Sequence, residues 1–111
     1  MASQLTFPPD AEAGRALERA AELELDVNRD TDAIRTFKEA ADTYDTTDPM
    51  GKIRCLQRVI NYWVDTKGQF TTAAVYQKNL GELYLNQLND KDKAIEAYQL
   101  AADWYGGAQP Q

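Results

Sequence analysis

Histidine is absent from the 111 residues, and cysteine occurs only once, at Cys55. Without histidine, the sequence lacks the usual general base near neutral pH and the commonest transition-metal ligand. A single cysteine excludes a disulfide within these residues and a zinc site built from several thiolates. We therefore expect no catalytic site, no metal site and no cofactor, and the sequence predicts a protein that is not an enzyme.

Proline and glycine are scarce, at four and six residues, and long hydrophobic runs are missing. A helix that spans a bilayer needs about 20 consecutive apolar residues, and no run approaches that length, so we expect no transmembrane segment. The first residues carry no positive charge ahead of an apolar stretch, so we expect no signal peptide. These features predict one folded domain in a reducing, cytoplasmic setting.

Acidic residues outnumber basic ones by 18 to 12, which gives a net charge of -6 and predicts repulsion from nucleic acid. The charge is unevenly distributed: residues 1–47 carry -6, residues 48–78 carry +3 and residues 79–111 carry -3. The middle stretch could bind an acidic protein partner, or it could be the solvated edge of an ordinary helix. Its candidate partner-binding residues are Lys52, Arg54, Arg58, Lys67 and Lys78.

Apolar residues recur at helical spacing along the sequence, which predicts an all-α fold of about five antiparallel helices. Asp48 followed by Pro49 is typical of a helix start, because proline at the first helical position gives up no hydrogen bond. The helical domain should span residues 10–105, between a disordered leader (1–9) and a disordered tail (106–111). The expected helices cover about residues 10–27, 31–44, 49–66, 70–88 and 91–105.

An internal repeat is the most informative pattern. Residues 32–44 align with residues 93–105 and share Ala, Ile, Ala, Ala, Asp and Tyr in register. Each copy has the spacing Ala-x-x-x-aromatic-x-x-Ala, which is typical of the second helix of a tetratricopeptide (TPR) repeat. Small residues at these positions let helices approach closely. The pattern predicts a TPR-like α-α superhelix, a solenoid of helical hairpins.

The last helix carries more apolar residues than one buried face needs. We expect its core stripe to consist of Ala94, Ile95, Tyr98, Ala101, Ala102 and Tyr105. Leu100 and Trp104 then form a second apolar edge. A terminal repeat normally presents a polar outer face, so we expect this edge to be covered by a following repeat or by another copy in an oligomer.

The order of these motifs resembles the alpha-type soluble NSF attachment protein (alpha-SNAP) family. The resemblance covers most of the sequence but only about the middle third of a family member. It rests on the segments Asp48-Pro49 to Arg58, Tyr62-Trp63, Gly68-Gln-Phe-Thr-x-Ala-Ala74, Leu80-Gly-Glu-Leu-Tyr84 and Lys93 to Tyr105.

The resemblance implies a protein-binding adaptor. Such a protein binds SNARE complexes and recruits the ATPase NSF, which disassembles them after membrane fusion, in vesicle-mediated intracellular protein transport. It also implies a cytoplasmic location, peripheral to membranes. The family's hydrophobic N-terminal loop has no counterpart before Asp10 and its NSF-engaging C-terminal segment none up to Gln111, so we do not expect this stretch alone to support disassembly.

Four positions depart from the family pattern. Asp45, Thr46, Gln69 and Val75 stand where relatives tend to have basic residues on the SNARE-facing side. The residues alone leave a second hypothesis open, a generic TPR-like scaffold or oligomerisation module that binds an unrelated protein partner, because a shared fold does not fix a shared function.

Overall fold

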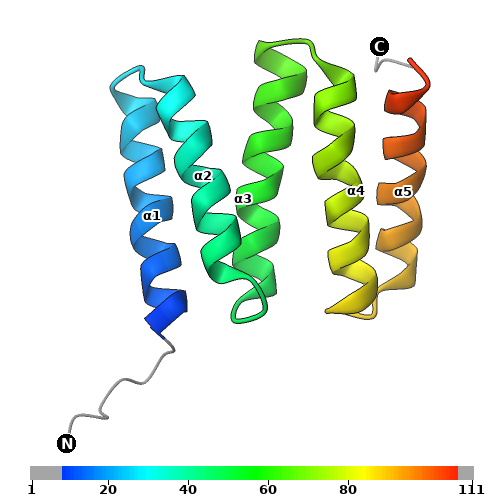
Figure 1. Cartoon of the computed structure of the whole chain (residues 1–111), viewed down its shortest axis with the longest axis horizontal. Helices are drawn as coiled ribbons and strands as arrows, with labels where there is room; N and C mark the ends of the chain where they lie inside the picture. Colours follow the sequence, from blue (N-terminus) through cyan, green and yellow to red (C-terminus); the bar gives the residue numbers. More distant parts are fainter. Residues whose placement is uncertain (1–8, 108–111) are drawn as a thin grey trace, which may run out of the picture. The chain divides into compact units, whose positions relative to one another are not determined.

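The computed structural model describes residues 9–107, which form five helices joined by short turns, with no β-strand in that range (Figure 1). The expected leader and tail lie largely outside the described residues, except for Pro9, which belongs to the first helix, and for Gly106 and Gly107, which form a turn after the last helix. The helices are α1 (Pro9–Asp26), α2 (Asp30–Tyr44), α3 (Pro49–Asn61) with its extension η1 (Tyr62–Thr66), α4 (Phe70–Asn86) and α5 (Lys91–Tyr105). The predicted all-α, helical-hairpin class is confirmed.

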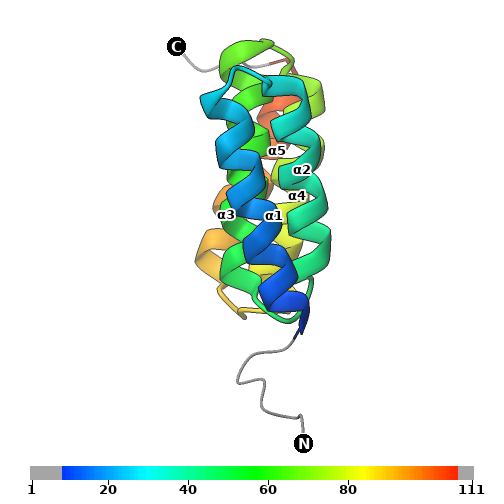
Figure 2. The same cartoon turned by 90° about the vertical axis from the view of Figure 1, so that its left-hand side faces the viewer.

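The chain divides into two compact units, Met1–Cys55 and Leu56–Gln111, and the division falls within α3. In the first unit, α1 and α2 lie side by side and run antiparallel (Figures 1 and 2). In the second unit, α4 and α5 form the corresponding antiparallel pair. Each unit therefore contains one complete helical hairpin and one part of α3.

Helix boundaries follow local chemistry. Asp48 caps α3, because its Oδ1 atom accepts a hydrogen bond from the backbone N–H of Gly51 at 3.1 Å. Asp90 caps α5 in the same way, through the N–H of Lys93 at 3.1 Å. Helix α1 begins at Pro9, one residue before the predicted start of the helical domain, so Asp10 lies within its first turn. Proline suits the first position because it needs no hydrogen-bond acceptor there.

The two hairpin turns share one backbone feature. Asn28, between α1 and α2, has a φ angle of 63°, and Asn89, between α4 and α5, has a φ angle of 52°. Asparagine tolerates this left-handed conformation better than most residues. The two asparagines are 61 residues apart, the same distance as the aligned copies of the sequence repeat.

The end of the third helix is a π-helix. The backbone N–H of Lys67 donates to the carbonyl of Tyr62 at 3.1 Å, which closes the wider turn. The prediction that this helix reaches about Thr66 is confirmed, although its last turn is not α-helical. Such π-turns are rare and insert one extra residue into a helix.

Each unit has its own hydrophobic core. In the first unit the fully buried side chains include Phe37, Tyr44 and Cys55, so Cys55 packs as a small apolar residue. In the second unit, Val59 is fully buried and small residues of both α4 and α5 are buried. These small residues are Ala73, Ala74, Ala94, Ala97 and Ala101.

Candidate partner-binding surfaces

The best-defined polar cluster lies in the first unit and joins three of its helices. Glu18 on α1 accepts two hydrogen bonds from Arg54 on α3, from Nε and from an Nη atom, each at 2.9 Å. It also accepts a hydrogen bond from the Tyr44 hydroxyl on α2 at 2.6 Å. We call these three residues the Glu18 cluster. Two parallel bonds from a guanidinium fix both distance and orientation, so the cluster ties α1, α2 and α3 together.

Tyr44 sits in a socket made by two glycines. A Cβ atom placed on Gly14 would lie 2.5 Å from the ring of Tyr44, and one on Gly51 would lie 2.9 Å from it. Both distances are shorter than carbon atoms tolerate, so only glycine lets α1 and α3 approach the ring this closely. The close approach also places the hydroxyl beside Glu18.

Burial and the hydrogen bond change the acid–base behaviour of the cluster. Desolvation, followed by the hydrogen bond to the Glu18 carboxylate, raises the pKa of Tyr44 far above the usual tyrosine value. The hydrogen bond to Glu18 also raises the pKa of Arg54, so this guanidinium stays charged at any pH at which the protein folds. Near neutral pH, Tyr44 therefore keeps its proton and Arg54 keeps its charge.

The predicted basic residues have different neighbours. Arg54 is held by Glu18, and Lys52 lies 3.4 Å from the carboxylate of Asp45. Lys67 lies over the ring of Tyr62, with Nζ 5.8 Å from the ring centre. Lys52 and Arg54 belong to the first unit, and Arg58, Lys67 and Lys78 belong to the second. A single basic surface formed by all five residues therefore stays a prediction.

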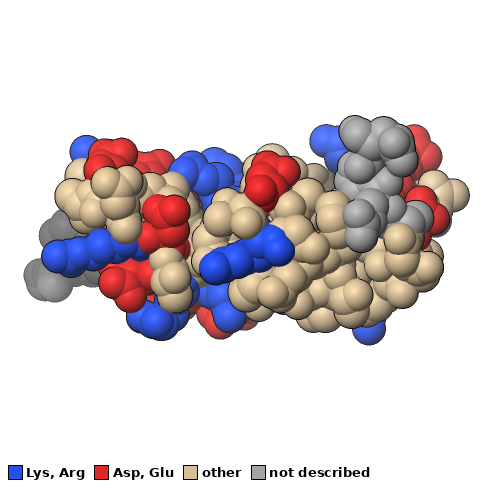
Figure 3. Space-filling model, turned by 90° about the horizontal axis from the view of Figure 1, so that it is seen from above, with Lys and Arg blue, Asp and Glu red and all other residues tan. Residues whose placement is uncertain are grey.

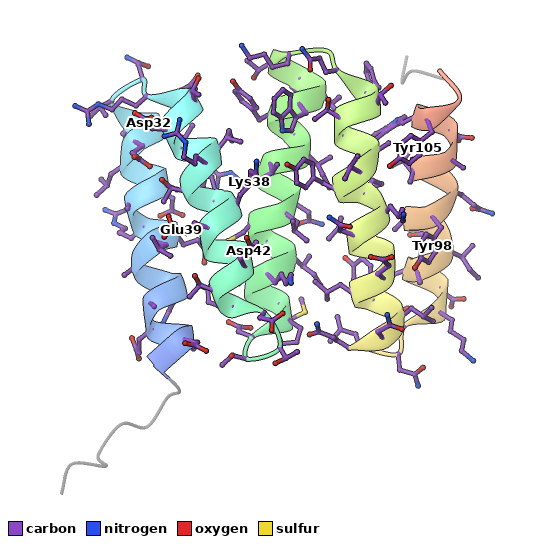
Figure 4. All side chains as sticks on the ribbon, viewed as in Figure 1. Asp32, Lys38, Glu39, Asp42, Tyr98 and Tyr105 are labelled. Atoms are coloured by element: carbon purple, nitrogen blue, oxygen red, sulfur yellow. The ribbon has the colours of Figure 1, made fainter. Side chains whose placement is uncertain are left out.

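Charges of both signs are mixed on the surface. On the face shown in Figure 3, Lys and Arg side chains are interspersed with Asp and Glu instead of gathering in one area. Helix α2 also presents charges of both signs, and its Asp32, Lys38, Glu39 and Asp42 are labelled in Figure 4. Asp32 pairs with Arg35 at 3.0 Å.

The predicted apolar edge of α5 requires a correction. Trp104 is only 7% exposed, because its ring packs edge-on against Phe70 of α4, with the ring centres 5.8 Å apart. Trp104 therefore belongs to the core of the second unit and not to an open edge. Leu100 is 38% exposed and stays a candidate contact residue.

The core stripe predicted for α5 is also partly wrong. Ile95 and Tyr105 are exposed, as is Ala102, whereas Ala97 and Trp104 are buried with Ala94 and Ala101. The buried face is thus rotated by about a quarter turn from the expected one. Tyr98 lies half-buried, with its ring against Gly81 of α4 (Figure 4).

No group of three or more Cys, Asp or Glu side chains within residues 9–107 could hold a metal ion. In the same range, none of the helices is both long enough and apolar enough to cross a membrane.

Comparison with known families decides the relationship of the chain. The family model described as "Soluble NSF attachment protein, SNAP" matches residues 10–111. The chain belongs to the soluble NSF attachment protein (SNAP) family.

Curated relatives support this assignment of the SNAP-family chain. It is 38% identical over 95 residues to the alpha-soluble NSF attachment protein of Mus musculus, covering 86% of the chain and 32% of that protein. It is 36% identical over 97 residues to a probable vesicular-fusion protein sec17 homolog of Schizosaccharomyces pombe, covering 87% of the chain and 33% of that protein. The chain therefore spans about a third of the length of these relatives. No solved structure matches it.

Sequence reasoning about this SNAP-family chain missed the Glu18 cluster. Gly14 and Glu18 are one helical turn apart on α1. A glycine within a sequence that otherwise strongly favours a helix indicates that another part of the protein packs closely against the helix at that position. Nothing in the sequence indicates that Tyr44, 26 residues further on, fills that space. Which side chain fills the space beside such a glycine depends on how the helices pack, and the sequence alone does not show this.

Proposed function

We propose that this chain is part of a protein adaptor that binds assembled SNARE complexes and recruits the ATPase NSF in vesicle-mediated transport, and that it is not an enzyme. The observation that supports the proposal is the match of the SNAP family model over residues 10–111. The helical-hairpin fold agrees with an adaptor, because hairpin solenoids present extended surfaces to other proteins. We place the chain at the cytoplasmic side of membranes, peripheral to the bilayer.

The basic residues of the middle stretch are the proposed SNARE contacts. Arg54, Arg58 and Lys78 are all exposed, and Arg54 also binds Glu18 of α1. We assign these three residues to contacts with an acidic helical bundle. Lys52 and Lys67 would add longer-range attraction. Because the contacts are charged and exposed, binding should weaken as salt rises.

The test is retention of the chain on an immobilised, assembled SNARE bundle at about 50 mM and about 500 mM salt, where screening differs strongly. We expect retention at low salt, and a loss of several-fold for the variant Arg58→Glu/Lys78→Glu. Lys91→Glu/Lys93→Glu, two exposed reversals in the first turn of α5, is the control because it changes the net charge by the same amount. Absence of retention at low salt, or equal loss in the control, would contradict the proposal.

Arg54→Glu is unsuitable as a binding test. It would place a second carboxylate against Glu18, which lies on the opposing helix, and the repulsion would disturb the packing of the first unit. A loss of retention in that variant could come from unfolding alone. Arg58 and Lys78 are better probes because they lie outside that cluster.

A further inference from the structure

A buried glutamine interrupts the apolar stripe of α4. Gln77 is only 8% exposed, and it lies one turn before the buried Leu80 on the same side of the helix. Burying a carboxamide without a hydrogen bond costs free energy. The first hairpin carries Leu17 at the equivalent position, counted from the pattern Glu-Leu-x-Leu that residues 22–25 share with residues 82–85. An apolar side chain therefore suits this position, and packing alone does not require the glutamine.

The side-chain amide of Gln77 makes no hydrogen bond to another residue within the range 9–107. In the same range, the polar atoms that are sealed from solvent and lack a partner belong to Glu24 and Trp63. The amide of Gln77 is therefore unpartnered but still accessible. It opens into a cavity of about 260 Å³ that this residue lines. A buried polar side chain that faces a cavity in this way is suited to orient a ligand.

Three helices of the second unit form the walls of this cavity. Helix α3 contributes Gln57, α4 contributes Gln77 and Leu80, and α5 contributes Ala97 and Leu100. Two carboxamides from neighbouring helices thus lie beside an apolar surface. Such a lining fits a ligand that combines an apolar group with hydrogen-bonding groups.

The charged residues of the cavity cancel each other. Lys93 and Glu96 of α5 line it and carry opposite charges. The Nζ atom of Lys93 lies 5.7 Å from the ring centre of Tyr84, which also lines the cavity. The lining therefore carries no net charge, which favours a neutral ligand over an anion or a cation.

The side of α5 that lines the cavity is open in the repeat copy as well. Helix α2 is equivalent to α5 with an offset of 61 residues, and α3 follows α2 in the first unit. The α2 residues equivalent to Glu96 and Leu100 are Arg35 and Glu39, and both are exposed. A helix that follows the hairpin thus leaves this side of the second helix uncovered.

We propose that the cavity binds an extended segment of a partner protein through the backbone of one residue. In an extended chain, the N–H and C=O groups of one residue point to the same side. The carboxamide of Gln77 can accept a hydrogen bond from that N–H and donate one to that C=O, which satisfies both of its ends. An apolar side chain of the bound residue would lie against Leu80, Ala97 and Leu100.

A helical partner could not make this contact along its length, because its backbone groups are already bonded within the helix. A neutral, extended segment fits both the unpartnered amide and the cancelled charges. Gln57, which is exposed on α3, would bond the next peptide group of the segment. The site is therefore distinct from the surface proposed for the helical SNARE bundle and does not rest on that function.

The test titrates the protein with N-acetyl-leucine-N-methylamide, which is one leucine between two peptide groups. Nuclear magnetic resonance follows the side-chain NH₂ signals of Gln77, which are assigned by their absence in Gln77→Leu. We expect these signals to shift with a dissociation constant of about 1–10 mM, as is usual for so small a ligand. N-acetyl-proline-N-methylamide lacks the central N–H and should bind about 10-fold more weakly.

The variant Gln77→Leu gives a second and independent readout. Because leucine removes an unpartnered buried amide, the melting temperature should rise by about 4–8 °C. Binding of the leucine probe, followed by the backbone signals of Leu80 and Leu100, should weaken about 10-fold. Gln99→Leu, at an exposed glutamine of α5 outside the cavity lining, is the matched control and should bind the probe as the unsubstituted chain does.

Three outcomes would overturn the proposal. The signals of Gln77 could stay unchanged at a probe concentration well above the expected dissociation constant. The leucine and proline probes could bind equally well, or Gln99→Leu could weaken binding as much as Gln77→Leu, which would show that the amide of Gln77 does not read the backbone. The melting temperature of Gln77→Leu could fall, which would show that the amide has a partner within the folded chain. None of these outcomes bears on binding to SNARE complexes.

Discussion

Tyr44 is the residue on which the packing of the first unit depends. Its ring fills the space left by Gly14 and Gly51, and its hydroxyl donates to Glu18, which also accepts from Arg54. The burial of an aromatic residue at this position could be predicted from the spacing of the repeat. The hydrogen bond could not, because it joins residues from two helices whose register only the folded chain defines.

The raised pKa of Tyr44 predicts a stability change in alkaline solution. Above about pH 10, the ordinary tyrosine pKa, Tyr44 ionises in the unfolded chain but keeps its proton in the folded chain. The unfolded state then binds fewer protons, so the free energy of unfolding should fall as pH rises from about 10 to 12. Urea unfolding at several pH values measures this loss.

The control for this prediction is Tyr44→Phe, which lacks the titrating group. It should lose about 1.5–3 kcal/mol at neutral pH, because one hydrogen bond to a charged group is removed, but it should show a shallower decline above pH 10. If the two proteins declined in parallel, Tyr44 would not be the group responsible.

At the scale of helices, the two hairpins use glycine to different degrees. Gly14 of α1 meets a ring that is fully buried and hydrogen-bonded, whereas Gly81 of α4 meets the ring of Tyr98, which is half-buried. A Cβ atom on Gly81 would lie 3.0 Å from that ring, compared with 2.5 Å for Gly14 and Tyr44. The first hairpin is therefore the less tolerant of an added methyl group.

Alanine substitution of these two glycines should change the free energy of unfolding by different amounts in the two hairpins. We expect Gly14→Ala to lower the free energy of unfolding by about 1–3 kcal/mol, because overpacking outweighs the gain in helix propensity of about 1 kcal/mol. Gly81→Ala should be close to neutral, because the ring of Tyr98 has room to move. Thermal unfolding followed by circular dichroism compares the two variants.

A second substitution tests the cause of the Gly14 effect. In a Tyr44→Leu background the ring is gone, so Gly14→Ala should no longer destabilise the chain. Equal destabilisation by Gly14→Ala in both backgrounds would show that the clash with Tyr44 is not the reason.

The helices also show which structural features could be predicted from the sequence and which could not. The start of α3 was predictable because Asp48-Pro49 is a local signal. The buried face of α5 was not, because both of its stripes are apolar, and periodicity cannot tell which of two apolar stripes meets α4. The contact between Trp104 and Phe70 decides this. The five basic residues were visible in the sequence, but the engagement of Arg54 by Glu18 was not.

At the scale of the whole molecule, the chain consists of two compact units divided within α3. Helical-hairpin proteins are stabilised mainly by contacts between neighbouring elements, so a local change need not spread evenly through the chain. A destabilising change in the first unit should therefore affect that unit more than the second.

Two optical probes test this expectation on Gly14→Ala. Circular dichroism reports helices of both units, whereas tryptophan fluorescence reports the second unit, which contains Trp63 and Trp104. We expect the unfolding midpoint to shift more by circular dichroism than by fluorescence. Equal shifts would mean that the two units unfold as one cooperative structure.

The placement of the aromatic residues gives each unit its own intrinsic spectroscopic probe. Both tryptophans and five of the six tyrosines follow Cys55, so Tyr44 is the one tyrosine of the first unit. An ultraviolet difference spectrum between the protein and its Tyr44→Phe variant thus isolates a single chromophore in the socket between Gly14 and Gly51. Events in either unit can be followed separately without attaching a dye.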